Sequence, residues 1–89
     1  MELWSSDRED VGVTRPNHSF GQTIARLRRY AGLTQEELAH RARIHPTYVS
    51  QIERGLKSPT VTVILRLAKA LDVSLGELMQ AFENTRRRK

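Results

Sequence analysis

The polar side chains of residues 46–54 have the types and spacing needed to contact nucleic-acid bases. If this segment is a helix, with 100° between successive residues, Val49 and Ile52 point to one side. The opposite side then carries the polar side chains of Thr47, Ser50, Gln51 and Arg54. Hydroxyl, amide and guanidinium groups form hydrogen bonds with base edges and with phosphates. The pattern therefore predicts an outer face able to read bases, although an ordinary solvated helix face has the same periodicity.

The ends of this predicted helix are marked by residues that suit them. Pro46 fits the first helical position, where its missing N–H removes no bond, and Gly55 fits the residue after the end. Tyr48 lies at the boundary between the two faces. The predicted base-reading residues are Pro46, Thr47, Ser50 and Gln51.

A second short helix is predicted just before this one. Thr34 and Glu37 have the spacing of a capping box, and the helix that follows ends near residue 41 or 42, with Leu38 and Ala39 pointing inward. A turn at residues 42–45 joins the two helices. When two helices are connected in this way, one can lie across the phosphate backbone of DNA while the other enters the major groove.

Three further helices are predicted from apolar spacing. One spans residues 19–31 and is closed by Gly32, one begins near Thr60, and one is opened by a second capping box formed by Ser74 and Glu77. The positions expected to point inward are Phe20, Ile24, Leu27 and Ala31; Val61, Ile64, Leu65, Ala68 and Leu71; and Leu75, Leu78, Met79 and Phe82. The predicted fold is all-α, with five short helices around one core.

The chain of 89 residues supports a single domain. We expect a disordered arm at residues 1–18, the domain at 19–83 and a basic tail at 84–89, either a solvated end or an additional attraction to DNA. Residues 1–18 carry four acidic and two basic side chains, whereas 19–89 carry thirteen basic and six acidic ones. A basic domain favours a polyanionic partner, although many small domains are basic for solubility alone. The acidic arm could reduce nonspecific binding, contact a partner or be a simple tail.

Several classes of function lack support in the composition. Hydrophobic residues make up 38% of the chain and form no stretch near the roughly 20 apolar residues of a membrane span. Cysteine is absent, and His40 and His45 do not have the i, i+4 spacing of a helical metal site. No nucleophile and base stand out. We therefore expect a cytoplasmic protein that has no enzymatic activity, no cofactor, no metal and no membrane partner.

The stretch LTQEELAHRARIHPTYVSQIERGLKSPTVTVILRLAKALDVSLGEL resembles the phage repressor and Cro type (XRE-like) of helix-turn-helix domain, and the resemblance covers about residues 19–82. Small phage regulators and restriction-modification controller proteins are similarly short. The matching positions are Gln35, Leu38, Ala39, Ile44, 48–50, 52–55, Pro59, Leu67, Ala68, Leu71 and 73–74. The resemblance implies a five-helix domain whose third helix reads the major groove, with Gln35 bound to a phosphate.

The resemblance also implies an ion pair between Arg28 and Glu53 that fixes the first helix against the third. Arg43 departs from the family, which often has glycine at this position in the turn. A left-handed backbone is expected there, and a residue other than glycine then costs about 1 kcal/mol. Either the Arg43 side chain offsets part of this cost by binding a phosphate, or the turn has a different conformation. The residues predicted to position phosphates are Thr34, Gln35, Arg43, Tyr48, Arg54, Lys57 and Ser58.

These observations predict a transcription regulator that binds double-stranded DNA at a short palindromic operator. A homodimer is expected because one recognition helix reads only a few base pairs. So small a core cannot bury all the apolar side chains of the last predicted helix. The dimer interface is therefore predicted to consist of Leu75, Met79 and Phe82. The alternative is an antitoxin-like or adaptor protein that uses the same fold to bind a partner protein.

Overall fold

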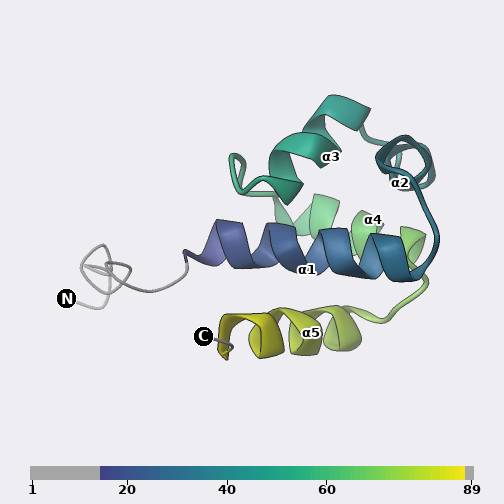
Figure 1. Ribbon diagram of the computed structural model, residues 1–89. Helices are drawn as coiled ribbons and strands as arrows, with labels where there is room; N and C mark the ends of the chain where they lie inside the picture. Colours follow the sequence, from purple (N-terminus) through teal and green to yellow (C-terminus); the bar gives the residue numbers. More distant parts are fainter. Residues whose placement is uncertain (1–14, 88–89) are drawn as a thin grey trace.

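The computed structural model describes residues 15–87, which form five helices joined by short loops (Figure 1). The helices are α1 (Pro16–Tyr30), α2 (Gln35–Ala42), α3 (Pro46–Glu53), α4 (Val61–Ala70) and α5 (Leu75–Arg87). α1 packs between α3 on one side and α5 on the other, while α2 contacts both α3 and α4. The prediction of an all-α, five-helix domain is confirmed.

Each helix contributes a fully buried aliphatic side chain to one core. Ile24, Leu38, Ile52, Leu67 and Leu78 come from α1 to α5 in order, and each is at most 1% exposed. Burying one such side chain contributes about 1.5–3 kcal/mol. The core therefore depends on all five helices, and the short α2 and α3 are held by tertiary packing rather than by their own helix propensity.

The predicted helix caps are present. The Thr34 hydroxyl accepts a hydrogen bond from the Glu37 amide at 3.0 Å, and the Glu37 carboxylate accepts one from the Thr34 amide at 2.8 Å. Ser74 and Glu77 form the same pair of bonds at the start of α5, at 2.9 and 2.8 Å. Gly32 has a φ of +76°, which suits its place after the end of α1.

α1 begins at Pro16, three residues before the predicted start at Ser19. Pro16 occupies the first turn of the helix, as Pro46 does in α3. The Ser19 amide donates to the Arg15 carbonyl oxygen at 2.9 Å, which closes that turn. The expected arm at 1–18 is therefore wrong for residues 16–18, and its first fourteen residues lie outside the described part of the chain.

α5 continues to Arg87, so residues 84–87 of the expected basic tail are helical. Thr85 is only 7% exposed, and its hydroxyl accepts a hydrogen bond from Arg26 Nη2 at 2.9 Å. The hydroxyl of Thr23 lies 2.9 Å from that of Thr85. These polar contacts hold the end of α5 against α1, and only residues 88–89 of the tail lie outside the described residues.

The predicted inward face of α4 is partly wrong. Val61 is 70% exposed and Leu65 is 48% exposed, whereas Leu67 is fully buried. Apolar side chains occur on almost every side of this helix, so periodicity alone could not select the face. The row that packs against the core contains Ile64, Leu67, Ala68 and Leu71.

Candidate nucleic-acid interface

The turn between α2 and α3 sets the crossing of these two helices. The Ile44 amide donates to the Ala39 carbonyl oxygen at 3.0 Å, and Arg43 adopts the left-handed conformation, with φ 61° and ψ 43°. Ala39 is fully buried in α2 and Val49 is fully buried in α3. A small side chain at Ala39 permits the close approach of α2 and α3.

The outer face of α3 carries the side chains predicted to read bases. Pro46 and Thr47 are exposed, and Ser50 and Gln51 are half-buried. Among the described residues, the side chains of Thr47, Ser50 and Gln51 have no hydrogen-bond partner. His45 was missed by sequence reasoning: its Nδ1 accepts from the Thr47 amide at 3.1 Å and so caps α3. The start of α3 thus presents unengaged polar groups on a helix that is capped and packed.

The ion pair between Arg28 and Glu53 is present and holds the end of α3 against α1. Arg28 Nε donates to Glu53 Oε2 at 2.7 Å and Nη2 donates to Oε1 at 3.1 Å. Arg28 Nη1 also donates to the Leu33 carbonyl oxygen at 2.8 Å. The side chains of Arg28 and Glu53 are only 12% and 6% exposed. The pair is therefore largely removed from water, and each charge depends on the other.

Gln35 joins this ion pair, a contact that the sequence did not predict. Its Nε2 donates to Glu53 Oε1 at 2.9 Å, so the amide group links the start of α2 to the end of α3. The backbone of Gln35 lies in the first turn of α2, where helix N–H groups lack intrahelical partners and favour anions. A phosphate contact by Gln35 therefore fits its backbone N–H better than its side chain.

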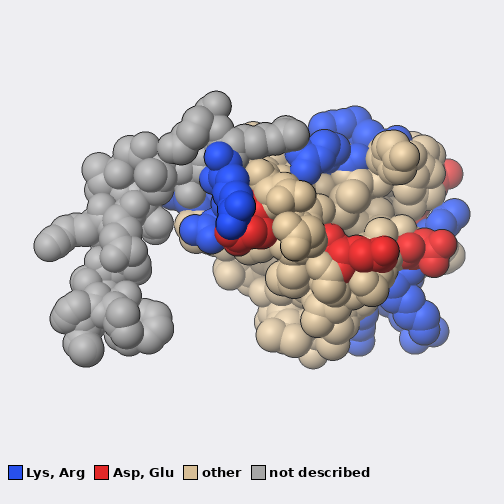
Figure 2. All heavy atoms as spheres, turned by 90° about the horizontal axis from the view of Figure 1, so that it is seen from below, with Lys and Arg blue, Asp and Glu red and all other residues tan. Residues whose placement is uncertain are grey.

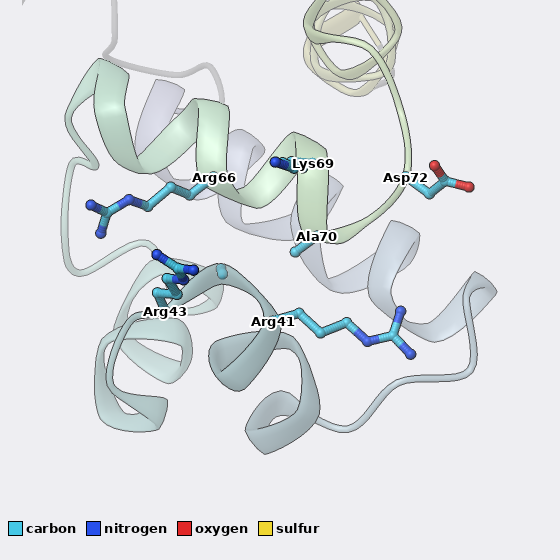
Figure 3. A pocket seen from close by; sticks show the side chains of 7 residues that line it. Arg41, Arg43, Arg66, Lys69, Ala70 and Asp72 are labelled. Carbon is cyan, nitrogen blue, oxygen red and sulfur yellow. The ribbon is translucent and has the colours of Figure 1, made fainter.

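The other residues predicted to position phosphates divide into three groups. Arg54, Lys57 and Ser58 are exposed at the end of α3 and in the loop that follows it, and Thr34 is exposed at the start of α2. Tyr48 is half-buried and packs against the core. Arg43 differs, because it lines a hollow between α2 and α4 together with other basic side chains (Figure 3).

The predicted dimer-interface residues lie along one side of α5 but are not equally free. Leu75 is 42% exposed, whereas Met79 and Phe82 are half-buried and pack against the core of their own chain. The Phe82 ring meets Phe20 edge to face, with the ring centres 5.5 Å apart. Figure 2 shows the molecule from the α5 side, where a broad uncharged area lies between groups of charged side chains.

Other kinds of site gain no support from residues 15–87. Within that range, no three His, Asp or Glu side chains are grouped so that they could hold a metal ion. No helix in the same range is long and apolar enough to cross a membrane.

Comparison with known proteins identifies the class to which this fold and this α2–α3 arrangement belong. A family model described as helix-turn-helix matches residues 24–78, and the chain belongs to this family. It is 46% identical over 65 residues to the uncharacterized HTH-type transcriptional regulator y4dJ of Sinorhizobium fredii, covering 73% of this chain and 84% of the relative. It is 36% identical over 61 residues to the control protein C.BamHI of Bacillus amyloliquefaciens, covering 67% and 75%.

Solved structures of restriction-modification controller proteins have the same fold. The controller protein C.AhdI from Aeromonas hydrophila matches with a TM-score of 0.68 and 40% identity, over 70% of this chain and 94% of that one. The controller protein C.Esp1396I, solved as a tetramer in complex with its natural 35 base-pair operator, matches with a TM-score of 0.79 and 25% identity. That match covers 84% of this chain and 99% of the controller protein.

Proposed function

We propose that this protein is a transcription regulator that binds a short palindromic operator as a homodimer, with α3 in the major groove. The observation that carries the proposal is the outer face of α3, where polar side chains without partners among residues 15–87 stand on a helix fixed by a buried ion pair. A reading helix must be held rigidly, because base recognition depends on hydrogen bonds of defined direction. The names of the relatives describe regulators rather than enzymes, which supports the same role in the cytoplasm.

Two kinds of DNA contact are assigned by position. Side chains at the start and on the outer face of α3 read base edges: Pro46, Thr47, Ser50 and Gln51. Groups at the first turn of α2 and around the end of α3 hold phosphates, which carry no base identity: Thr34, Gln35, Tyr48, Arg54, Lys57 and Ser58. Arg43 is left out of this second group because it lies with α4 residues at the hollow between α2 and α4.

A second copy of the chain is proposed to cover the apolar side of α5. Leu75 is the most exposed of the three residues on this side and contributes least to the core of its own chain. The uncharged area seen in Figure 2 can be buried without removing charges from water. Two-fold pairing presents two α3 helices to half-sites about 34 Å apart on one side of the duplex.

The test begins with selection of bound duplexes from a random DNA pool, which yields the half-site and its symmetry together. Gln51→Ala and Lys57→Ala are then compared on the selected duplex and on a scrambled one over a range of salt concentrations. Gln51→Ala should cost about 1–3 kcal/mol on the selected site and little on the scrambled duplex, because an amide can bind adenine in a bidentate manner. Lys57→Ala should weaken both and reduce the salt slope by about one unit.

Equal weakening of both duplexes by Gln51→Ala would show that α3 is not the reading element. If no DNA sequence were enriched from the pool, the proposed function would be wrong, and an adaptor role with a partner protein would be favoured instead.

A further inference from the structure

A hollow of about 630 Å³ lies between α2 and α4, on the side of the turn that carries Arg43. Four basic side chains border it: Arg41 from α2, Arg43 from the turn, and Arg66 and Lys69 from α4 (Figure 3). Asp72 is the one acidic residue in its lining. None of these residues belongs to the outer face of α3.

Within residues 15–87, none of the four cations at the hollow forms an ion pair with a carboxylate. The ion pairs formed among the described residues use only Glu53 and Glu83 as acids, and neither borders the hollow. Like charges gathered around one concave surface repel one another and attract an anion more strongly than a convex surface does. The arrangement therefore favours a negatively charged occupant.

Backbone strain is concentrated at the same place. In residues 15–87, the non-glycine residues with positive φ are Arg43, at 61°, and Asp72, at 60°, and both line the hollow. Asp adopts this conformation readily, but Arg does so rarely and at a cost of about 1 kcal/mol. Glycine would suit the end of α2 better. An arginine kept in a strained position points to a use for its side chain.

We propose that this hollow binds a small anion that carries at least two phosphate groups, separately from the DNA-binding face. Guanidinium groups match the oxygens of phosphates in bidentate geometry, and Lys69 adds a point charge. Arg43 of the turn and Arg66 of α4 extend to the same side of the hollow in Figure 3, so one anion can lie between them. Such a ligand would fix the α2–α3 turn relative to α4.

A small ligand fits this place better than a DNA backbone because the four cations come from α2, the turn and α4, and none comes from the outer face of α3. Arg41 also borders a second hollow on α2, which is lined by Glu36, Glu37 and His40. A compact anion held between α2 and α4 avoids these carboxylates.

The placement of these cations also has a simpler explanation, which the test must separate from ligand binding. Arg41 and Lys69 lie in the last turns of α2 and α4, where a positive charge interacts favourably with the helix dipole. That effect needs no ligand. It also gives no reason for Arg43 to remain in a left-handed conformation.

The experiment is calorimetric titration of the full chain with pyrophosphate, without DNA and at constant ionic strength. Three variants are compared: Arg43→Gly, Arg66→Gln and the matched control Arg29→Gln, which removes an exposed cation from α1. Arg43→Gly and Arg66→Gln should each weaken pyrophosphate binding by at least about tenfold, because each removes a charge-assisted hydrogen bond. Arg29→Gln should leave it unchanged.

Arg43→Gly removes the side chain and relieves the backbone strain at once, so loss of binding cannot be attributed to misfolding. Its unfolding temperature should equal or exceed that of the original chain. Absence of pyrophosphate binding, or equal weakening by Arg29→Gln, would overturn the proposal. So would variants that bind pyrophosphate normally but bind DNA with a smaller salt slope, since the cations would then contact the duplex. Because the titration contains no DNA, its result is independent of the proposed regulator function.

Discussion

Replacing Glu53 by alanine should destabilise the domain far more than removal of an exposed charged side chain of residues 15–87. The substitution removes two hydrogen bonds from Arg28 and one from Gln35. It leaves the Arg28 guanidinium, only 12% exposed, with the Leu33 carbonyl oxygen as its remaining partner. An uncompensated charge in such a position typically costs about 3–5 kcal/mol. The free energy of unfolding of a small domain is about 5–15 kcal/mol in total, so Glu53→Ala would remove much of the stability.

The change can be measured by thermal and urea denaturation followed by circular dichroism. For a domain of 60–100 residues, 1 kcal/mol shifts the unfolding midpoint by about 4–8 °C, so Glu53→Ala should lower it by at least about 12 °C. Glu83→Ala is a matched control, because its contacts with Arg86 and Arg87 are exposed and worth at most about 1 kcal/mol. Adding Arg28→Met to Glu53→Ala should restore part of the loss by removing the buried charge.

The reasoning would be refuted if Glu53→Ala cost no more than Glu83→Ala. It would also be refuted if the double variant were as unstable as the sum of its two single changes. Additivity would mean that Arg28 and Glu53 act as independent surface charges rather than as one buried unit.

Four further substitutions test the packing and the proposed dimer interface. Gly21→Ala would place a Cβ 2.2 Å from the Ile52 carbonyl oxygen, so it should lower the free energy of unfolding in urea by at least about 1–3 kcal/mol. Gly76→Ala should be neutral or stabilising, because the atom nearest to its Cβ is 3.8 Å away. Leu75→Ser should weaken self-association in light scattering without lowering the free energy of unfolding of the monomer. Phe82→Ala should weaken self-association and also lower the free energy of unfolding by about 3–5 kcal/mol, because its ring packs against Phe20. An effect on association alone would contradict that packing.

Features set by neighbouring residues were predictable from the sequence. Three kinds of feature depend on contacts within four residues: the capping boxes opened by Thr34 and Ser74, the start of α3 at Pro46 and the turn at Gly32 after α1. The left-handed backbone at Arg43 was expected from the family pattern and is present. The ion pair between residues 28 and 53 also came from the resemblance, because spacing alone does not connect positions on different helices.

Features that depend on contacts between distant helices were not predictable. Nothing near Gly21 indicates that the backbone of α3 passes so close that a side chain cannot fit. The inward face of α4 was misassigned because Val61 and Leu65 are as apolar as the residues that are buried. The helical conformation of residues 84–87 depends on contacts between Thr85 and α1. The basic residues of this segment do not indicate those contacts. In each case the deciding contact joins residues far apart in the sequence.

Glu53 connects the stability of the domain to the geometry of the face proposed to bind DNA. Its carboxylate is shared by Arg28 from α1 and Gln35 from α2, and Glu53 itself ends α3. One buried acid therefore sets the position of the first turn of α2, proposed to hold a phosphate, relative to α3, proposed to read bases. Since a buried charge tolerates little displacement from its partners, the two helices must move together. A phosphate at the start of α2 would thus fix the depth at which α3 enters the groove.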